Sequence, residues 1–218
     1  SMRDLRKFYI KGSWLDPMGQ ETLNVINPAT EDVAGVIALG NQGDVDLAVQ
    51  AAKTAFPAFA AMEKADRLAL LDKIIEIYKR RFSDLALAVT EEMGAPSWLS
   101  ERAQVPIGLG HLMQARKVLE GFEFEELRGT SLIRHEPIGV CGLITPWNWP
   151  VNQVMCKLAP ALAAGCAVVL KPSEVAPFSA QIIAEILDEA GVPEGVFNLV
   201  FGDGAGAVSY THLRAHET

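Results

Sequence analysis

Two short apolar runs, separated by a segment of helical length, constrain the fold of this chain more than any other feature. Residues 140–144 (VCGLI) and 167–170 (AVVL) each have the length of a buried strand, and the segment between them has the apolar spacing of a helix. Polar turns follow both runs, at residues 145–150 and 171–174. Such a βαβ crossover predicts a parallel sheet, with its binding chemistry at the carboxyl ends of the strands.

The pattern continues after the crossover. A helical segment from residue 178 to about 190 leads to an apolar run at 196–201, and a glycine-rich turn follows at 202–206. Three consecutive strand, turn and helix units are typical of a doubly wound parallel sheet. We therefore predict an α/β fold of the Rossmann-like type.

The first half of the chain is patterned differently, and a boundary falls near Pro137. Residues 8–14 predict a hairpin that turns at Lys11 and Gly12. With strands expected at 22–26 and 33–39, it should form a small antiparallel layer apart from the main sheet. The fold should then be a parallel sheet with an amino-terminal helical and β layer, the two halves packing as one domain.

Helical spacing of apolar residues accounts for most of the remaining first half. Asp44 is predicted to cap a first helix that stops near Pro57. Further helices are expected at 64–80, 82–93 and 98–121, the last with an interruption or only a kinked start at Pro106.

A protruding β-arm is expected near residues 122–137. The segment 120–128 is strongly acidic, and residues 130–135 alternate as a strand that Glu136 and Pro137 end. Acidic residues and proline are typical of a protected edge strand, or of an exposed arm that joins subunits.

Charge and composition exclude several classes of protein. The net charge of −8 and the pI near 5.0 argue against nucleic acid or an anionic membrane as a partner. No uncharged apolar segment reaches the roughly 18 residues of a membrane span, and the amino end has no apolar core of a signal peptide. The three cysteines contain no CxxC pair, which favours free thiols in a reducing compartment, the cytoplasm.

The polar turns and several shorter motifs resemble the aldehyde dehydrogenase superfamily of NAD(P)-dependent enzymes. In chain order they are NPAT at 27–30, EPIGV at 136–140, TPWNWP at 145–150, PALAAG at 160–165, KPSE at 171–174 and GVFN at 195–198. The resemblance implies one NAD(P)-binding domain over residues 1–206. Residues 207–218 do not resemble the family and are expected to be a non-native tail.

The turn after the first run holds the expected catalytic residue, Asn148. Its neutral amide has two N–H donors, which can be directed at a developing oxyanion. The resemblance implies this role, whereas an asparagine in a turn can also bond its own backbone. It also implies that Ile144, Thr145, Pro146 and Trp147 line the cofactor cleft.

The turn after the second run is implied by the resemblance to bind the adenosine ribose through Lys171, Ser173 and Glu174. A carboxylate at 174 suits a free ribose diol and repels a 2′-phosphate, which favours NAD while leaving NADP possible. A solvated lysine–glutamate pair is the alternative. Gly204 lies where the family's chain passes the adenine, although the sequence has no GxGxxG fingerprint.

The resemblance also implies a substrate tunnel. Trp149, Gln153 and Cys156 are four and then three residues apart, so they share a helix face. Corresponding positions line the family's tunnel, and Cys156 is therefore interpreted as a tunnel residue and not as the nucleophile. No metal site is expected, since His212 and His216 lack a third ligand.

By this resemblance the full-length parent oxidises an aldehyde to a carboxylic acid with NAD(P)+ through a cysteine thioester. The nucleophile and glutamate base have no counterpart in this chain, so it is expected to be inactive alone. The parent is expected to be a homodimer or homotetramer. Two alternatives remain open: a non-catalytic nucleotide-binding or scaffold module, and a reductive relative acting on acyl thioesters or acyl phosphates.

Overall fold

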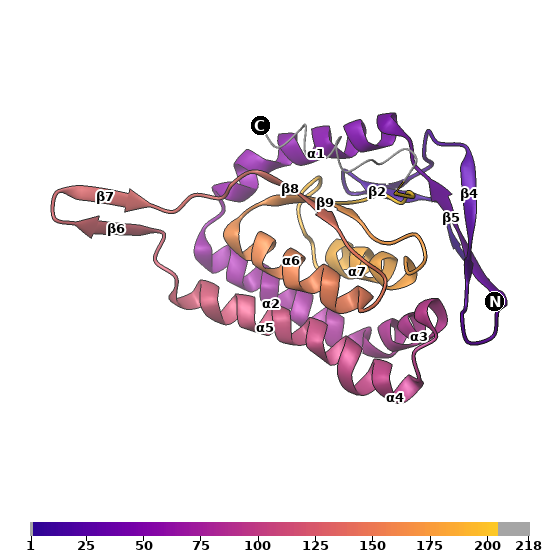
Figure 1. The fold of residues 1–218 in the computed structure, drawn as a ribbon. Helices are drawn as coiled ribbons and strands as arrows, with labels where there is room; N and C mark the ends of the chain where they lie inside the picture. Colours follow the sequence, from indigo (N-terminus) through magenta and orange to yellow (C-terminus); the bar gives the residue numbers. More distant parts are fainter. Residues whose placement is uncertain (1, 205–218) are drawn as a thin grey trace.

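A five-stranded sheet forms the centre of the molecule, as the computed structural model describes it for residues 2–204 (Figure 1). Its strand order is β3-β2-β10-β9-β8. The parallel part comprises β8 (Val140–Ile144), β9 (Ala167–Lys171) and β10 (Phe197–Leu199), joined through α6 (Pro150–Ala164) and α7 (Phe178–Glu189). The predicted parallel α/β fold is confirmed.

The other two strands of this sheet correct a prediction. β2 (Phe8–Ile10) and β3 (Ser13–Leu15) form the expected hairpin, but β2 also pairs antiparallel with β10, at Leu199 and Tyr9. The hairpin therefore belongs to the main sheet and not to a separate layer. All three residues of β2 are buried, which requires that both faces of the sheet are covered at this strand.

A second, three-stranded sheet lies at one end of the molecule, where the amino terminus also lies (Figure 1). It has the order β1-β5-β4, with β1 at Arg3–Leu5, β4 at Glu21–Ile26 and β5 at Val33–Leu39. β4 and β5 are antiparallel, as expected of this part of the amino-terminal layer, whereas β1 joins β5 in parallel.

Helix α1 (Gln42–Ala60) differs from its prediction at both ends. Its N-cap is Asn41, and the predicted cap, Asp44, instead completes a capping box by accepting from the Asn41 backbone N–H at 2.9 Å. The helix also runs through Pro57. A proline this close to the end removes only one hydrogen bond, and a buried arginine, Arg67, donates to carbonyl oxygens of the last turn, which have no partner within the helix.

The remaining helices follow the predicted stripes. They are α2 (Lys64–Arg80), α3 (Phe82–Met93), the short α4 (Ser97–Leu99) and α5 (Val105–Gly121). Pro106 lies in the first turn of α5, and the interruption lies before it, as a π-helical turn at Ser100–Gln104.

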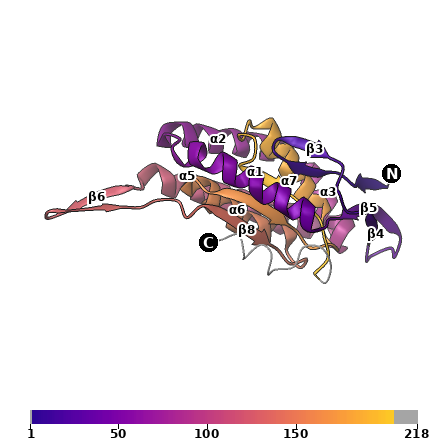
Figure 2. The same cartoon turned by 90° about the horizontal axis from the view of Figure 1, so that it is seen from above.

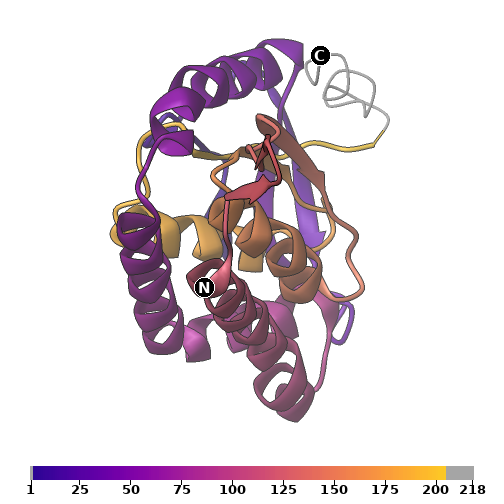
Figure 3. The same ribbon diagram turned by 90° about the vertical axis from the view of Figure 1, so that its left-hand side faces the viewer.

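The helices cover both faces of the main sheet. α1 lies against β8, β9 and β10 on one face, whereas α6 and α7 cover the other, and α2 and α5 form a further layer beyond them (Figures 1 and 3). The two halves of the chain thus pack as one unit, because α5 of the first half lies along α6 of the second. No helix among residues 2–204 is both long and apolar enough to cross a bilayer.

The β-arm projects away from this body as a hairpin (Figures 1 and 2). The acidic segment supplies its first strand, β6 (Glu125–Arg128), which pairs antiparallel with β7 (Ser131–Arg134). Leu127 lies opposite Leu132, and these side chains are 71% and 58% exposed. The arm therefore presents an apolar pair to its surroundings.

Candidate active site

The carboxyl ends of β8 and β9 bring the two polar turns together. The strands are in register from Val140 opposite Ala167 to Ile144 opposite Lys171, so both end at the same level. One residue further, the Thr145 backbone N–H donates to the Lys171 carbonyl oxygen at 3.3 Å. The half-site around Asn148 and the half-site that begins at Lys171 therefore adjoin one another.

Asn148 lies exposed in the bend between β8 and α6. Its amide forms no hydrogen bond with any residue from 2 to 204, so the alternative of a turn asparagine bonded to its own backbone does not describe it. Pro146 and Trp147 beside it are also exposed, whereas Thr145 is buried beneath them. Pro150 begins α6 directly after Trp149, which is its N-cap. The amide donors are thus free and stand on a short, proline-bounded bend.

Lys171 is not a solvated surface residue, because only 4% of it is exposed. Its Nζ donates to the carbonyl oxygens of Pro172 at 2.9 Å and Gly202 at 2.8 Å, and lies 3.6 Å from the Glu174 carboxylate. Burial lowers the pKa of Lys171, and the charges of Glu174 and Asp203 act in the opposite direction. The ammonium therefore holds the end of β9, the Glu174 carboxylate and the turn after β10 together.

The other residues expected at the cofactor lie on these turns. The Ser173 hydroxyl is nearly buried and accepts from the Val175 backbone N–H at 3.4 Å. Gly204 is exposed, and no heavy atom lies within 4 Å of the place a β-carbon would occupy. Glu174 retains one third of its side-chain exposure. A partly exposed carboxylate beside an open glycine turn fits a ribose diol and its attached base.

The three residues expected to line the substrate tunnel lie at the start and along the first half of α6. Gln153 and Cys156 are half-buried on α6, and Trp149 is half-buried at its start. The Lys157 Nζ donates to Gln153 Oε1 at 3.1 Å and to the Gln153 carbonyl at 3.0 Å. Sequence reasoning missed Lys157, although its spacing of four residues from Gln153 is the helical signal that could have found it.

An apolar cavity of about 330 Å³ distinguishes Cys156 from the other two expected tunnel residues. It lies between α5, α6 and the base of the arm, and Cys156 lines it, whereas Trp149 and Gln153 do not. Its lining residues are His111, Gln114, Ala115, Val118, Leu119, Phe122, Phe124, Cys156, Pro160, Ala163 and Ala164. Cys156 therefore faces a pocket of its own.

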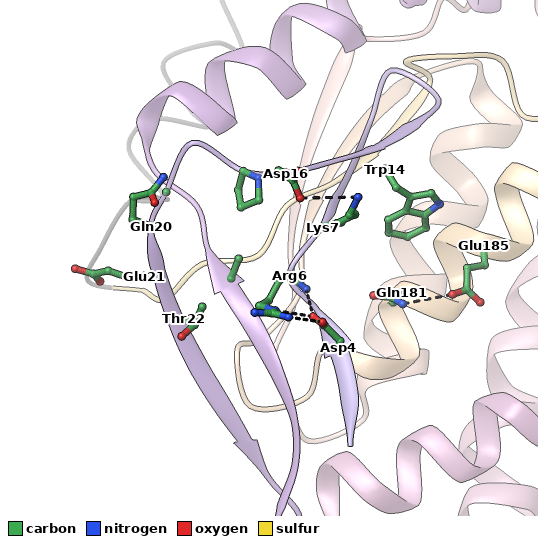
Figure 4. Close-up of a pocket in the computed structure, with 13 residues that line it drawn as sticks. Asp4, Arg6, Lys7, Trp14, Asp16, Gln20, Glu21, Thr22, Gln181 and Glu185 are labelled. Atoms are coloured by element: carbon green, nitrogen blue, oxygen red, sulfur yellow. Dashed lines mark hydrogen bonds and ion pairs between the residues drawn. The ribbon is translucent and has the colours of Figure 1, made fainter. Parts of the chain in front are cut away.

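A polar groove of about 800 Å³ lies elsewhere, between the first strands and α7 (Figure 4). Its charged side chains pair with one another, as Arg6 with Asp4 at 2.6 Å and Lys7 with Asp16 at 3.9 Å. Gln181 likewise donates to Glu185 at 3.4 Å (Figure 4). These mutual pairings leave no convergent set of free donors, so the strand ends remain the better candidate site.

The positions of the cysteines limit what the site can do. Cys141 and Cys166 lie at the amino ends of β8 and β9, opposite to Asn148. Cys156 lies about 9 Å along α6 from its first residue, by the helical rise of about 1.5 Å per residue. None of the three accompanies the Asn148 amide. Within residues 2–204 no three metal-ligating side chains form a cluster, and the pair His212 and His216 lies outside the described residues.

Comparison with known proteins agrees with this geometry. The model of the aldehyde dehydrogenase family matches residues 14–216. The chain is 54% identical over 206 residues to 3-succinoylsemialdehyde-pyridine dehydrogenase of a Pseudomonas species, covering 94% of this chain and 43% of that protein. The chain thus spans less than half the length of this curated relative.

Solved structures show the same fold. An aldehyde dehydrogenase from Bartonella henselae superposes with a TM-score of 0.91 at 49% identity, over 94% of this chain and 44% of that one. A mutant of aldehyde dehydrogenase C from Pseudomonas syringae, in complex with NAD+ and octanal, superposes with a TM-score of 0.92 at 44% identity, over 95% and 44%. Fold, motifs and sequence therefore agree, and the chain belongs to the aldehyde dehydrogenase family.

Proposed function

We propose that this chain is the cofactor-binding portion of an enzyme that oxidises an aldehyde to a carboxylic acid with NAD(P)+. The observation that carries the proposal is the meeting of two half-sites at the ends of β8 and β9. One supplies the free Asn148 amide, and the other supplies Lys171 and Glu174. The Pseudomonas syringae relative, which binds NAD+ and octanal, supports both ligands.

NAD fits the second half-site better than NADP. The Glu174 carboxylate is partly exposed and can accept from both hydroxyls of a ribose. Lys171 cannot neutralise an added 2′-phosphate, because its Nζ is buried on the carbonyl oxygens of Pro172 and Gly202. Ile144, Thr145, Pro146 and Trp147 would border the cofactor on the neighbouring strand, and Gly204 would border its adenine.

The role that we assign to this chain in the reaction is to stabilise negative charge on the carbonyl oxygen of the substrate. When bound, NAD supplies the acceptor for the hydride that leaves the aldehyde carbon. The Asn148 amide donates to the carbonyl oxygen as negative charge develops on it, which is worth about 3 kcal/mol in comparable sites. Trp149 and Gln153 would border the substrate on its way to Asn148, whereas Cys156 lines the separate apolar cavity between α5 and α6.

Cofactor binding is tested by titrating NAD into the purified chain and following tryptophan fluorescence, since Trp147 is 57% exposed at the site. Glu174→Gln should weaken NAD binding roughly tenfold, because a charged hydrogen-bond acceptor is lost. Glu189→Gln, on the exposed end of α7, is the matched control and should bind as the unchanged chain does. Equal affinities of the two variants would contradict the ribose assignment.

Turnover is a separate measurement. We expect the chain alone to produce no NADH from NAD and an aldehyde, because none of its cysteines accompanies Asn148. A steady rise in NADH absorbance would contradict this. In the full-length parent, Asn148→Ala should lower kcat at least a hundredfold with NAD affinity retained; an unchanged kcat would refute the oxyanion role.

The β-arm is proposed to pair with another subunit in a homodimer or homotetramer of the parent. The exposed leucine pair, Leu127 and Leu132, supports this, because an apolar pair on a projecting hairpin is otherwise left in water. In this chain the arm should promote association, measurable by light scattering, and Leu127→Lys with Leu132→Glu should reduce it. A monodisperse monomer of the unchanged chain would count against the proposal. Cytoplasmic location stays a prediction.

A further inference from the structure

Two of the three cysteines meet at the amino ends of the central strands, away from the site proposed for the cofactor. Cys141 is the second residue of β8 and Cys166 directly precedes β9. Cys141 pairs in register with Val168, two residues after Cys166, so both cysteines point to the same face of the sheet. The Cys141 thiol donates a hydrogen bond to the Cys166 sulfur.

The surroundings of the Cys166 sulfur favour a negative charge. Besides the Cys141 thiol, the backbone N–H groups of Gly139 and Ile138 donate to it, and the Arg67 guanidinium lies nearby. Together these groups lower the pKa of Cys166 to about 6, against the opposing effect of burial. A lowered pKa increases the share of the thiolate, which is the reactive form of cysteine.

Within the described part of the chain, the positive charge of Arg67 is not paired with a carboxylate and can therefore stabilise this thiolate. It is buried, and its guanidinium donates only to backbone carbonyl oxygens, those of Phe59, Ala60, Met62 and Ala163. No carboxylate among residues 2–204 forms an ion pair with it, and its Nε has no partner there. A β-carbon at Gly165 would lie 2.9 Å from its Nη2, which places the guanidinium directly beside the residue that precedes Cys166.

A cavity lies close to this pair of cysteines. A cavity of about 670 Å³ lies between the base of the arm and the turn from α1 to α2, and its lining includes Arg67, Pro137 and Ala164. Pro137 directly precedes the backbone donors, and Ala164 lies two residues before Cys166. The cavity therefore reaches residues that flank Cys166, whose own side chain is buried behind them.

We propose that Cys166 and Cys141 form a site of reversible oxidation by hydroperoxides, in which Cys166 reacts first and Cys141 then closes a disulfide. The Cys166 thiolate attacks one peroxide oxygen, the O–O bond breaks, and the other oxygen leaves as water after taking up a proton. Cys166 is then a sulfenic acid. The Cys141 thiol loses its proton, its sulfur displaces the hydroxyl group, and a second water leaves. Two thiols are oxidised while one peroxide is reduced to two waters.

Closure of the disulfide requires a small backbone shift. An ideal offset of two residues between neighbouring strands separates their α-carbons by about 8 Å, slightly more than the roughly 7 Å that a disulfide spans. Gly139 and Gly165, with φ of 128° and 91°, precede the two cysteines. No heavy atom lies within 4 Å of the β-carbon position of Gly139, so the chain there has room to move.

The test is to treat the purified chain with a small excess of hydrogen peroxide and map its peptides by mass spectrometry. We expect the peptides of Cys141 and Cys166 to become linked with the loss of two hydrogens, reversibly by a thiol reductant. Cys156, which lies on α6 away from the other two cysteines, is the internal control and should remain reduced.

Two variants separate the steps. In Cys141→Ser, Cys166 should stop at the sulfenic acid and be trapped by dimedone. In Cys166→Ser, Cys141 should react no faster than Cys156. The proposal is overturned if Cys156 oxidises as fast as the pair. It is equally overturned if the unchanged chain accumulates sulfenic acid without a disulfide, or if peroxide leaves all three thiols intact.

Discussion

Two glycines on helix α5 should respond in opposite directions to the same substitution. Gly108 and Gly110 lie two residues apart, but Gly108 is buried where α5 crosses α6, whereas Gly110 is exposed. A β-carbon at Gly108 would lie 2.4 Å from the Tyr78 hydroxyl oxygen and 2.6 Å from Val151 Cγ1. At Gly110 no heavy atom lies within 4 Å of the same position.

The magnitudes follow from two opposing effects. Replacing glycine by alanine inside a helix gains about 0.8–1 kcal/mol in helix propensity at either position. At Gly108 overpacking costs about 1–3 kcal/mol, and loss of the hydrogen bond from Tyr78 to the Val105 carbonyl oxygen, 2.7 Å long, costs about 1 kcal/mol more. Gly110→Ala should therefore stabilise the chain by nearly 1 kcal/mol, whereas Gly108→Ala should destabilise it by about 1–3 kcal/mol.

Urea unfolding followed by circular dichroism measures both variants, provided that the slope with urea is unchanged. The double variant Gly108→Ala with Tyr78→Phe removes the hydroxyl that the new methyl group meets. It should recover part of the loss, which identifies the clash as its cause. If the two alanine variants differ by less than about 0.5 kcal/mol, the close crossing of α5 and α6 is refuted as a determinant of stability.

Two further predictions concern buried charges. Arg67→Met should lower the free energy of unfolding in urea by about 3 kcal/mol or more, because four carbonyl oxygens at the ends of two helices lose a buried, charged donor. The control, Arg116→Met, removes an arginine with two carboxylate partners in water and should cost far less. Equal losses would contradict this prediction. Burial raises the pKa of Glu92 from 4.5 to about 7, although Ser179 and the Phe178 backbone N–H donate to it. A carboxyl group with a raised pKa stabilises the folded state at low pH. The free energy of unfolding of the unchanged chain, relative to Glu92→Gln, should therefore fall by roughly 3 kcal/mol between pH 4.5 and 7 and stay constant above. A difference between the two chains that does not depend on pH would contradict this.

Local patterns were sufficient to predict the elements that carry the site. The apolar runs that became β8 and β9 are bounded by prolines and polar residues, so their ends could be located within a residue or two. Because parallel strands end at one edge, the placement of the two polar turns side by side also followed from the crossover itself. The helical stripes of α2, α3 and α5 were equally readable, since their apolar spacing repeats over several turns.

Pairing between distant segments was not predictable in this way. The hairpin of β2 and β3 has the same turn and alternation whether it stands alone or joins a sheet, and only the presence of β10 beside Tyr9 decides between them. Pro57 is a local stop signal, yet α1 continues to Ala60, where the Arg67 guanidinium, seven residues further along the chain, bonds the last carbonyl oxygens.

The sequence by itself determined the fold class, the family and the residues at the strand ends, because these depend on periodicity and on motifs that are continuous in the chain. Only the tertiary structure decided which charges are buried and which groups they meet. The Lys171 ammonium donates to the carbonyl oxygen of Gly202 and not to water. The Cys166 sulfur accepts from the Cys141 thiol and lies near the Arg67 guanidinium. These contacts join segments tens of residues apart, and their energy depends on burial that packing alone creates.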